Sequence, residues 1–159
     1  MIRAITPSDH TAIRTLCATI FRKEDELPLL QKALSQCVTD LSFVALDDTN
    51  TIIGFTLVCI TPTNVYFRFT IPHCYELAFL GISPQYQGRG IGSRLLKETV
   101  TRIFQRSNQF TCWLLVDTVN KGAIAMYEKM GFRRWLTVHL SIPGHIMGLS
   151  YRRLKATGD

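Results

Sequence analysis

The fold of this chain is decided by the stretch ISPQYQGRGIGSRLL, residues 82–96. Three glycines, Gly88, Gly90 and Gly92, lie here between an apolar segment and a segment whose apolar residues follow helical spacing. Glycine adopts positive φ and lets a ligand approach the backbone with no Cβ in the way. The first N–H groups of the following helix lack intrahelical partners and carry the positive end of the helix dipole. The stretch therefore predicts an anion site, typically for a phosphate or diphosphate.

Two widespread phosphate motifs do not fit this stretch. A P-loop needs GxxxxGK[ST], and the sequence contains no such pattern. A dinucleotide-binding turn needs GxGxxG, but Ser93 or Leu95 stands where the third glycine would be. The pattern that fits is [QR]xxGx[GA], which is met by Gln87, Gly90 and Gly92. The stretch is therefore neither a P-loop nor a dinucleotide-binding turn.

Basic residues are concentrated in the C-terminal half of the chain. The net charge is +6, of which residues 1–79 contribute −2 and residues 80–159 contribute +8. Arg89, Arg94 and Lys97 lie within reach of the glycine-rich turn. This distribution suits a phosphate-rich ligand, either a nucleotide-like cofactor or nucleic acid. A solvated basic surface without a partner is the alternative, which charge alone does not exclude.

The remaining pattern predicts one mixed α/β domain over residues 1–159. The expected strands are 2–5, a hairpin over 42–60 with its turn at 47–50, 75–82, 111–116, and two runs within 132–154 separated by 141–144; the expected helices are about 8–21, 27–38, 90–106 and 120–130. The strand–turn–helix–strand order in the middle implies a parallel βαβ unit, with antiparallel strands before and after it. We therefore expect a mixed, mostly antiparallel sheet with flanking helices.

Composition limits the protein's compartment and its cofactors. The chain has 159 residues, 47% of them hydrophobic, which is enough to bury a core without metal or disulfides. Its apolar runs fall short of the ~20 residues that a membrane helix needs, and MIRAITPSDH lacks a secretory apolar region. We expect a cytoplasmic protein with no membrane partner. The five cysteines form no CxxC pair and the four histidines have no zinc-like spacing, so we expect buried free thiols and no metal.

A second motif lies downstream in VDTVNKGAIAMYEKMGF, residues 116–132. Together with [QR]xxGx[GA], it resembles the GNAT superfamily of acyl-CoA-dependent N-acetyltransferases. The family's Asn, small residue, Tyr and terminal Gly-Phe are matched by Asn120, Ala123, Tyr127, Gly131 and Phe132. From the start of the first motif to the end of the second, residues 82–132, they span about a third of the chain, and the order of the flanking elements is compatible with a single GNAT-like domain.

The resemblance implies acetyl-CoA as the cosubstrate and assigns residues to its binding. The pyrophosphate would rest on a cradle made by Gln87, Gly88, Arg89, Gly90, Ile91, Gly92 and Ser93. The pantetheine arm would take main-chain bonds from Leu80 and Ile82 on the preceding strand. The structural alternative is an ordinary glycine-rich connection that only turns the chain.

Three residues have both a catalytic and a structural interpretation. Tyr127 would be the general acid that returns a proton to the CoA thiolate, or else a core aromatic. Asn120 would bind pantetheine or orient the thioester, or cap a helix, and both roles are compatible. Glu76 would be the base that deprotonates the amine, because burial of a carboxylate raises its pKa. The alternative for Glu76 is a position at a frayed strand start, neutralised by a nearby arginine.

The acceptor is less well defined by the sequence. Its candidate contacts are the acidic run Glu24, Asp25 and Glu26, the aromatic residues Tyr66, Phe67 and Phe69, and the histidines His139 and His145. The acidic run favours a small cationic amine, with a peptide N-terminus as the close second and a lysine also open. Such a charged run is more often a solvated turn. Other classes are a non-catalytic acyl-CoA-binding module and, with no recognisable motif, a nucleic-acid-binding protein; a monomer and a homodimer are both open.

Overall fold

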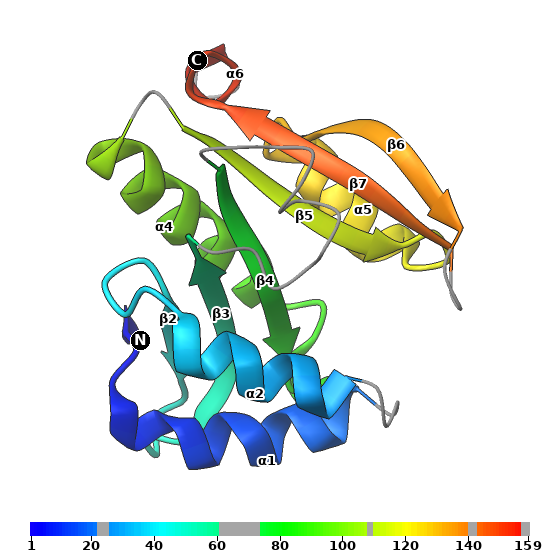
Figure 1. Cartoon of the computed structure of the whole chain (residues 1–159). Helices are drawn as coiled ribbons and strands as arrows, with labels where there is room; N and C mark the ends of the chain where they lie inside the picture. Colours follow the sequence, from blue (N-terminus) through cyan, green and yellow to red (C-terminus); the bar gives the residue numbers. More distant parts are fainter. Residues whose placement is uncertain (22–25, 61–73, 108–109, 140–142, 157–159) are drawn as a thin grey trace.

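The computed structural model describes residues 1–21, 26–60, 74–107, 110–139 and 143–156, which form a mixed sheet between two layers of helices (Figure 1). Its elements in chain order are β1 (Ile2–Ala4), η1 (Pro7–Asp9), α1 (His10–Ile20), α2 (Glu26–Gln36), β2 (Phe43–Leu46), β3 (Ile52–Cys59), β4 (Cys74–Ile82), η2 (Pro84–Tyr86), α4 (Ile91–Arg106), β5 (Thr111–Asp117), α5 (Lys121–Lys129), β6 (Arg133–His139), β7 (Pro143–Ser150) and α6 (Tyr151–Ala156).

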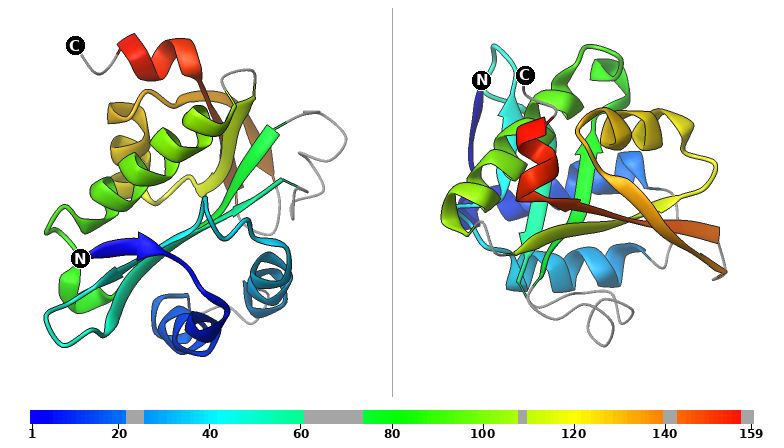
Figure 2. Two further views of the ribbon diagram at one scale, coloured as in Figure 1. Left: turned by 90° about the vertical axis from the view of Figure 1, so that its left-hand side faces the viewer. Right: turned by 90° about the horizontal axis from the view of Figure 1, so that it is seen from above.

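The sheet has seven strands within the described residues, in the order β1-β2-β3-β4-β5-β7-β6. The β4–β5 pair is parallel and the other five pairs are antiparallel. Figure 2 shows α1 and α2 on one side of the sheet and α4 and α5 on the other. We call these sides the α1/α2 face and the α4/α5 face. The predicted mixed, mostly antiparallel sheet with one parallel βαβ unit is confirmed.

The two parallel strands pair only at their beginnings. β4 and β5 are in register over three rungs, the last of which joins Glu76 to Trp113. The strands then separate, as Figure 1 shows for the ends of β4 and β5 that point away from the paired region. β4 continues beyond this rung in register with β3 as far as Ile82. One edge of β4, over residues 77–82, is therefore left facing the opening between the strands.

A β-bulge interrupts β4 just after it leaves β5. The register joins Leu77 to Val58 and Phe79 to Leu57, so Ala78 is the extra residue. The side chain of Leu77 packs in the cluster on the α4/α5 face. Both Ala78 and Phe79 pack instead in the cluster beneath α1 and α2. The bulge thus re-aims the strand where the opening begins, which is a common use of bulges near functional sites.

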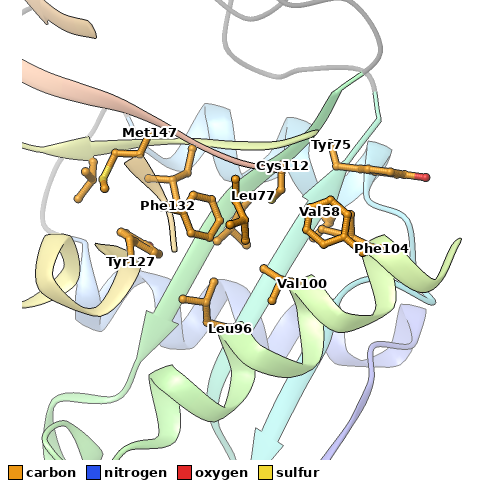
Figure 3. Close-up of a cluster of buried hydrophobic side chains, with 14 of the residues drawn as sticks. Val58, Tyr75, Leu77, Leu96, Val100, Phe104, Cys112, Tyr127, Phe132 and Met147 are labelled. Atoms are coloured by element: carbon orange, nitrogen blue, oxygen red, sulfur yellow. The ribbon is translucent and has the colours of Figure 1, made fainter. Parts of the chain in front are cut away.

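The main core fills the space between the sheet and the helices α4 and α5 (Figure 3). Leu96 and Val100 of α4 are fully buried against Leu77 of β4. Tyr127 of α5 belongs to the same cluster, and its ring centroid lies 5.7 Å from that of Phe132. This core holds α4 and α5 against the same face of the sheet.

One predicted element is wrong. The last strand-like run was expected to reach Leu154, but β7 ends at Ser150 and the next six residues form α6. Tyr151 and Leu154 are three residues apart and pack together against the main core, which a helical turn allows and a strand does not. The ring of Tyr151 lies 6.0 Å from that of Phe104 on α4. Tertiary packing therefore overrides the strand propensity of the run.

The five cysteines are free thiols, as predicted. Cys17, Cys59, Cys74 and Cys112 are buried and Cys37 is half-buried. Burial raises the pKa of Cys17 to about 12 and that of Cys74 to about 11, so these side chains are unreactive members of the core at neutral pH.

Candidate active site

The glycine-rich turn joins β4 to α4 in a conformation that favours glycine. Gly88 and Gly90 have φ angles of 75° and 74°. Gly90 is the N-cap of α4, and among the residues that the structure describes no side chain caps this helix. The helical ladder begins with the Arg94 N–H donating to the Gly90 carbonyl at 3.1 Å. The N–H groups of residues 91–93 therefore have no intrahelical acceptor and are available to an anion.

The space around the turn differs between its glycines. A Cβ at Gly88 or Gly90 would meet no heavy atom of the described chain within 4 Å. A Cβ at Gly92 would lie 3.3 Å from the Met126 sulfur on α5 and 3.6 Å from Ile82 on β4. The first two glycines thus leave the main chain open to a ligand. Gly92 instead allows the start of α4 to approach β4 and α5 closely.

Positive side chains surround the same helix start. Arg89, Arg94 and Lys97 are exposed on the turn and the first turns of α4. The Arg89 guanidinium lies 5.2 Å from the centroid of the Tyr86 ring, and the Tyr86 hydroxyl donates to Asp47 at 3.1 Å. Uncapped N–H groups, open glycines and three cations together fit a diphosphate group such as that of an acyl-CoA.

The side chains of two members of the predicted cradle are engaged within the protein and do not face a ligand. The Gln87 side-chain amide donates to the Ile82 carbonyl at 3.1 Å, so Gln87 ties the turn to the end of β4. The side chain of Ile91 is buried with Leu95, which leaves only its main-chain N–H to face a ligand. Ser93 is exposed beside them on the first turn of α4.

The open edge of β4 presents main-chain groups from the predicted residues. The Ser83 N–H donates to the Ile53 carbonyl of β3 at 2.8 Å, one rung beyond the end of β4. Because the direction of main-chain bonds alternates along an antiparallel strand, Ile82 and Leu80 direct their N–H and C=O groups away from β3. These groups face the opening between β4 and β5. Their position matches the predicted contacts to a pantetheine arm, although the Ile82 carbonyl is already bonded to Gln87.

Tyr127 and Asn120 lie on α5, across the opening from β4. Tyr127 is 7% exposed, and burial raises its pKa above the ordinary value, so its hydroxyl is protonated at neutral pH. The Asn120 side-chain oxygen accepts from the Ala123 N–H at 3.2 Å, which makes Asn120 the N-cap of α5. The helix-cap interpretation of Asn120 is therefore confirmed, and its side-chain NH₂ is left over for a ligand.

Glu76 lies at the point where the strands separate. It is 4% exposed and forms register pairs with Cys59 on β3 and Trp113 on β5. The alternative of an exposed, frayed strand start is therefore wrong, because strands flank this residue on both sides. Cys59 belongs to the cluster beneath α1 and α2, which places the Glu76 side chain on the α1/α2 face. Tyr127 is on the α4/α5 face, so the two predicted catalytic side chains lie on opposite sides of the opening.

The acceptor candidates are dispersed. Glu26 is the first residue of α2, and its charge contributes to raising the pKa of Cys17 on α1. The Thr137 hydroxyl and His145 Nδ1 are 2.9 Å apart, and His139 is exposed at the end of β6. The other five acceptor candidates lie outside the described residues, namely Glu24, Asp25, Tyr66, Phe67 and Phe69.

Sequence reasoning missed an aromatic pair next to Glu76. The ring centroids of Trp113 on β5 and Trp135 on β6 are 5.1 Å apart. Their sequence separation hides this contact, and only the β5-β7-β6 strand order brings them together. The signal available in the sequence was Gly148, because a glycine inside a strand often marks the close approach of another group.

The described structure joins an uncapped, glycine-rich helix start to a sheet that opens between two parallel strands, an arrangement suited to the class of acyl-CoA-dependent acyltransferases. The chain belongs to the acetyltransferase (GNAT) family, whose family model matches residues 10–132. The predicted family and its GNAT-like fold are thereby confirmed.

Known relatives resemble parts of the chain. It is 45% identical over 65 residues to the N-alpha-acetyltransferase RimI of Mycobacterium tuberculosis, an alignment that covers 41% of this chain and 39% of that protein. It is 36% identical over 73 residues to a mycothiol acetyltransferase of Salinispora arenicola, covering 46% of this chain and 24% of the relative. The matched region thus spans well under half of these relatives' own lengths.

The fold as a whole resembles that of solved acetyltransferases. The crystal structure of the NatC complex bound to Gag peptide and CoA contains a chain with a TM-score of 0.77 and 19% sequence identity, covering 94% of this chain and 97% of that one. No helix within the described ranges has the length and apolar character needed to cross a bilayer. Among the same residues, no group of three or more His, Cys, Asp or Glu side chains could hold a metal ion.

Proposed function

We propose that this chain is an N-acetyltransferase that moves the acetyl group of acetyl-CoA directly to a primary amine. The observation that carries the proposal is the opening between β4 and β5, which has the glycine-rich turn at its mouth, Tyr127 on one side and Glu76 on the other. Both ligands can then meet within one ternary complex, and no residue of the chain needs to carry the acetyl group. Family membership and the similarity to RimI support an amine as the acceptor.

The cosubstrate would be held by main-chain groups. The N–H groups of residues 91–93, together with Gly88 and Gly90, would bind the pyrophosphate. The main-chain groups of Leu80, and the N–H of Ile82, would pair with the pantetheine arm along the open edge of β4. Bound acetyl-CoA supplies a thioester, whose acetyl carbon is the electrophile.

Residues of the chain would accept one proton, donate another and stabilise the negative charge that develops on the carbonyl oxygen. The Glu76 carboxylate, directly or through water, takes a proton from the acceptor ammonium, which frees the nitrogen lone pair for attack. A main-chain N–H near the Ala78 bulge stabilises the oxyanion as the C–N bond forms. The C–S bond then breaks, and Tyr127 donates its hydroxyl proton to the leaving sulfur; the second proton of the attacking nitrogen leaves through water and restores the Tyr127 hydroxyl. The high pKa of Tyr127 keeps that proton in place until the thiolate develops.

Two acceptor classes are retained from the sequence. A small cationic amine was favoured by the acidic run Glu24–Glu26, of which only Glu26 falls within the described residues. A peptide N-terminus is supported by the similarity to RimI, an N-alpha-acetyltransferase. We further propose a cytoplasmic location, because five free cysteines fit a reducing compartment. A monomer and a homodimer both remain compatible with the site, which lies within one chain.

The test is a screen of amines and peptides with acetyl-CoA, read out by release of free CoA thiol. Turnover with at least one amine is expected, together with saturable binding of acetyl-CoA. Glu76→Gln should lower kcat/KM by about 10²-fold at neutral pH, and part of the loss should be recovered at high pH, where the free amine is abundant. Binding of acetyl-CoA without turnover on any amine would favour the alternative, a non-catalytic acyl-CoA-binding module.

A further inference from the structure

Trp113 and Trp135 form an aromatic pair on the α1/α2 face of the C-terminal half of the sheet. Their ring centroids are 5.1 Å apart and their planes are inclined by 57°. Trp113 pairs in register with Glu76, so its side chain lies on the same face as that carboxylate, one strand away. The pair therefore extends outward from the position at which the acceptor amine would lose its proton.

The strands hold the inner ring of the pair in place. A Cβ at Gly148 on β7 would lie 2.6 Å from the Trp113 ring, which shows that the indole lies directly over this glycine. The Trp113 indole N–H also donates to the Thr111 hydroxyl at 2.6 Å. Both contacts restrict the rotation of the ring, so the surface it presents is preorganised.

The outer ring is exposed because of a second bulge. The register of β6 passes from Arg134 to Leu136, with Trp135 as the extra residue. Leu136 pairs with Ile146, a member of the cluster that also contains Trp113, so both residues 135 and 136 lie on the α1/α2 face. Trp135 is 57% exposed and Leu136 is 52% exposed. Two large apolar side chains at one bulge of an edge strand form an apolar surface continuous with the active site.

The charge beside this surface is positive. Arg133 is exposed and pairs in register with Gly148, which places it next to the Trp113 ring on the same face. An acceptor that carried a second cation here would be repelled by the guanidinium. An acceptor with an apolar group in this position would bury that group against the two indoles.

We infer that Trp113 and Trp135 form the specificity wall of the acceptor site, which binds a bulky apolar group adjacent to the reacting amine. This inference rests on the proposed function and narrows it. The preferred acceptor is an amine with an apolar substituent and without a second cation, of which a peptide with an apolar first residue is the accessible example. A polyamine is the disfavoured class.

The decisive experiment compares short peptides that differ only in the first residue, leucine against serine, with spermidine as a third acceptor. The wild-type chain should give the highest kcat/KM on the leucine peptide. Trp135→Ala should reduce kcat/KM on that peptide about ten-fold or more, mainly through KM, and leave the serine peptide almost unchanged. Trp135→Phe should restore most of the preference. Arg134→Ala is the matched control, because Arg134 pairs with Glu128 at 2.9 Å on α5 and should not change the preference.

A binding measurement separates recognition from turnover. Trp113 and Trp135 are the only two tryptophans in the sequence, so tryptophan fluorescence reports on this pair alone. In the presence of CoA, which prevents turnover, the leucine peptide should change the emission at concentrations where the serine peptide does not. Trp135→Phe retains a signal from Trp113 and should still report binding.

The outcomes distinguish this inference from the proposed function. Absence of turnover on every amine would overturn the proposed function, and with it the inference that Trp113 and Trp135 form the specificity wall. Turnover combined with an unchanged leucine preference in Trp135→Ala would overturn the wall alone. So would a higher kcat/KM for spermidine than for the leucine peptide.

Discussion

Glu76 on β4 and Trp113 on β5 face each other on the last rung at which these two strands are paired. Beyond this rung the strands separate, and the open edge of β4 begins. The proposed base and the proposed acceptor wall therefore meet at the vertex of the opening. Tyr127 lies on the opposite face of the sheet. In the proposed mechanism, the amine would therefore be deprotonated and the leaving sulfur protonated from opposite faces of the sheet.

Replacing Tyr127 with Phe tests the proposed acid. The variant keeps the ring that packs against Phe132 but loses the proton donor, so kcat should fall by about 10²-fold while acetyl-CoA affinity changes little. Single-turnover kinetics and isothermal titration would measure the two quantities. Tyr151→Phe is the matched control, because Tyr151 lies on α6 and packs against Phe104 of α4, and the kcat of this variant should equal that of the wild type.

The raised pKa of Tyr127 also predicts a pH profile. The acid is active when protonated, and burial moves its pKa above the ordinary value of about 10. Protonated Tyr127 therefore persists through neutral and mildly alkaline pH, and kcat should show no decline due to this group below about pH 9. A decline in that range that vanishes in Tyr127→Phe would contradict the assignment.

Replacing Gly90 with Ala tests the phosphate cradle. The substitution forces a Cβ into a backbone with φ of 74°, at a cost of about 1–2 kcal/mol, and puts a methyl group into the open space through which a diphosphate would approach the helix start. The KM for acetyl-CoA should rise several-fold while the KM of the amine changes little. Gly122→Ala is the control. Gly122 lies on the first turn of α5, and a Cβ added there would meet nothing within 4 Å in the described chain. An unchanged acetyl-CoA KM in Gly90→Ala would argue against binding at the turn.

Asp9 controls the acid stability of the N-terminal region. Its carboxylate accepts from both terminal nitrogens of Arg3, at 2.7 and 2.8 Å, and from the Thr6 N–H at 2.8 Å. The Arg3 hydrogen bonds, followed by those from Thr6, hold the pKa of Asp9 well below its ordinary value despite partial burial. A lowered folded-state pKa means that this contribution is fully present above the unfolded pKa of about 3.9 and is lost as the pH falls below it.

The corresponding variant is Asp9→Asn, measured by urea unfolding at pH 7 and at pH 3. It should lower the free energy of unfolding by about 1–3 kcal/mol at pH 7, and by less at pH 3, where the unfolded wild type binds a proton at Asp9 and part of the contribution is lost. Asp40→Asn is the control, because Asp40 forms an exposed pair with Arg106 at 3.0 Å and such pairs contribute about 0–1 kcal/mol. Equal losses at both pH values would exclude the ionised carboxylate as the cause.

Gly148 should be intolerant of even one added methyl group. A Cβ at this position would lie 2.6 Å from the Trp113 ring, so Gly148→Ala should displace the indole and cost about 1–3 kcal/mol of stability. Tryptophan emission should shift at the same time. In the double variant with Trp113→Leu the obstructing ring is gone, and the added cost of the alanine should be much smaller. Additive losses in this cycle would show that the two residues do not interact.

Much of the fold was predictable from local patterns. The helix from residue 91 begins directly after the glycine-rich turn. In the hairpin turn at 47–50, Asp47 accepts from Thr49 and Thr51. The start of α5 is capped by the Asn120 side chain, which accepts from Ala123. Each of these features depends on short-range chemistry. The C-terminal end of the chain was not predictable in this way. Tyr151 and Leu154 form a helix because they pack against the main core, and that surface exists only after folding.

The sequence by itself determined the proposed cosubstrate side of the site. The glycines of the turn, the basic residues beside it and Tyr127 lie in two contiguous segments, and each segment acts through a backbone conformation that its own residues impose. Only the tertiary structure decided the proposed acceptor side. Glu76, Trp113 and Trp135 come from three strands, and their proximity follows from where β4 and β5 part, from the insertion of β7 between β5 and β6, and from the bulge that exposes Trp135. Strand order and register join residues that are far apart in the chain, and no local pattern encodes them.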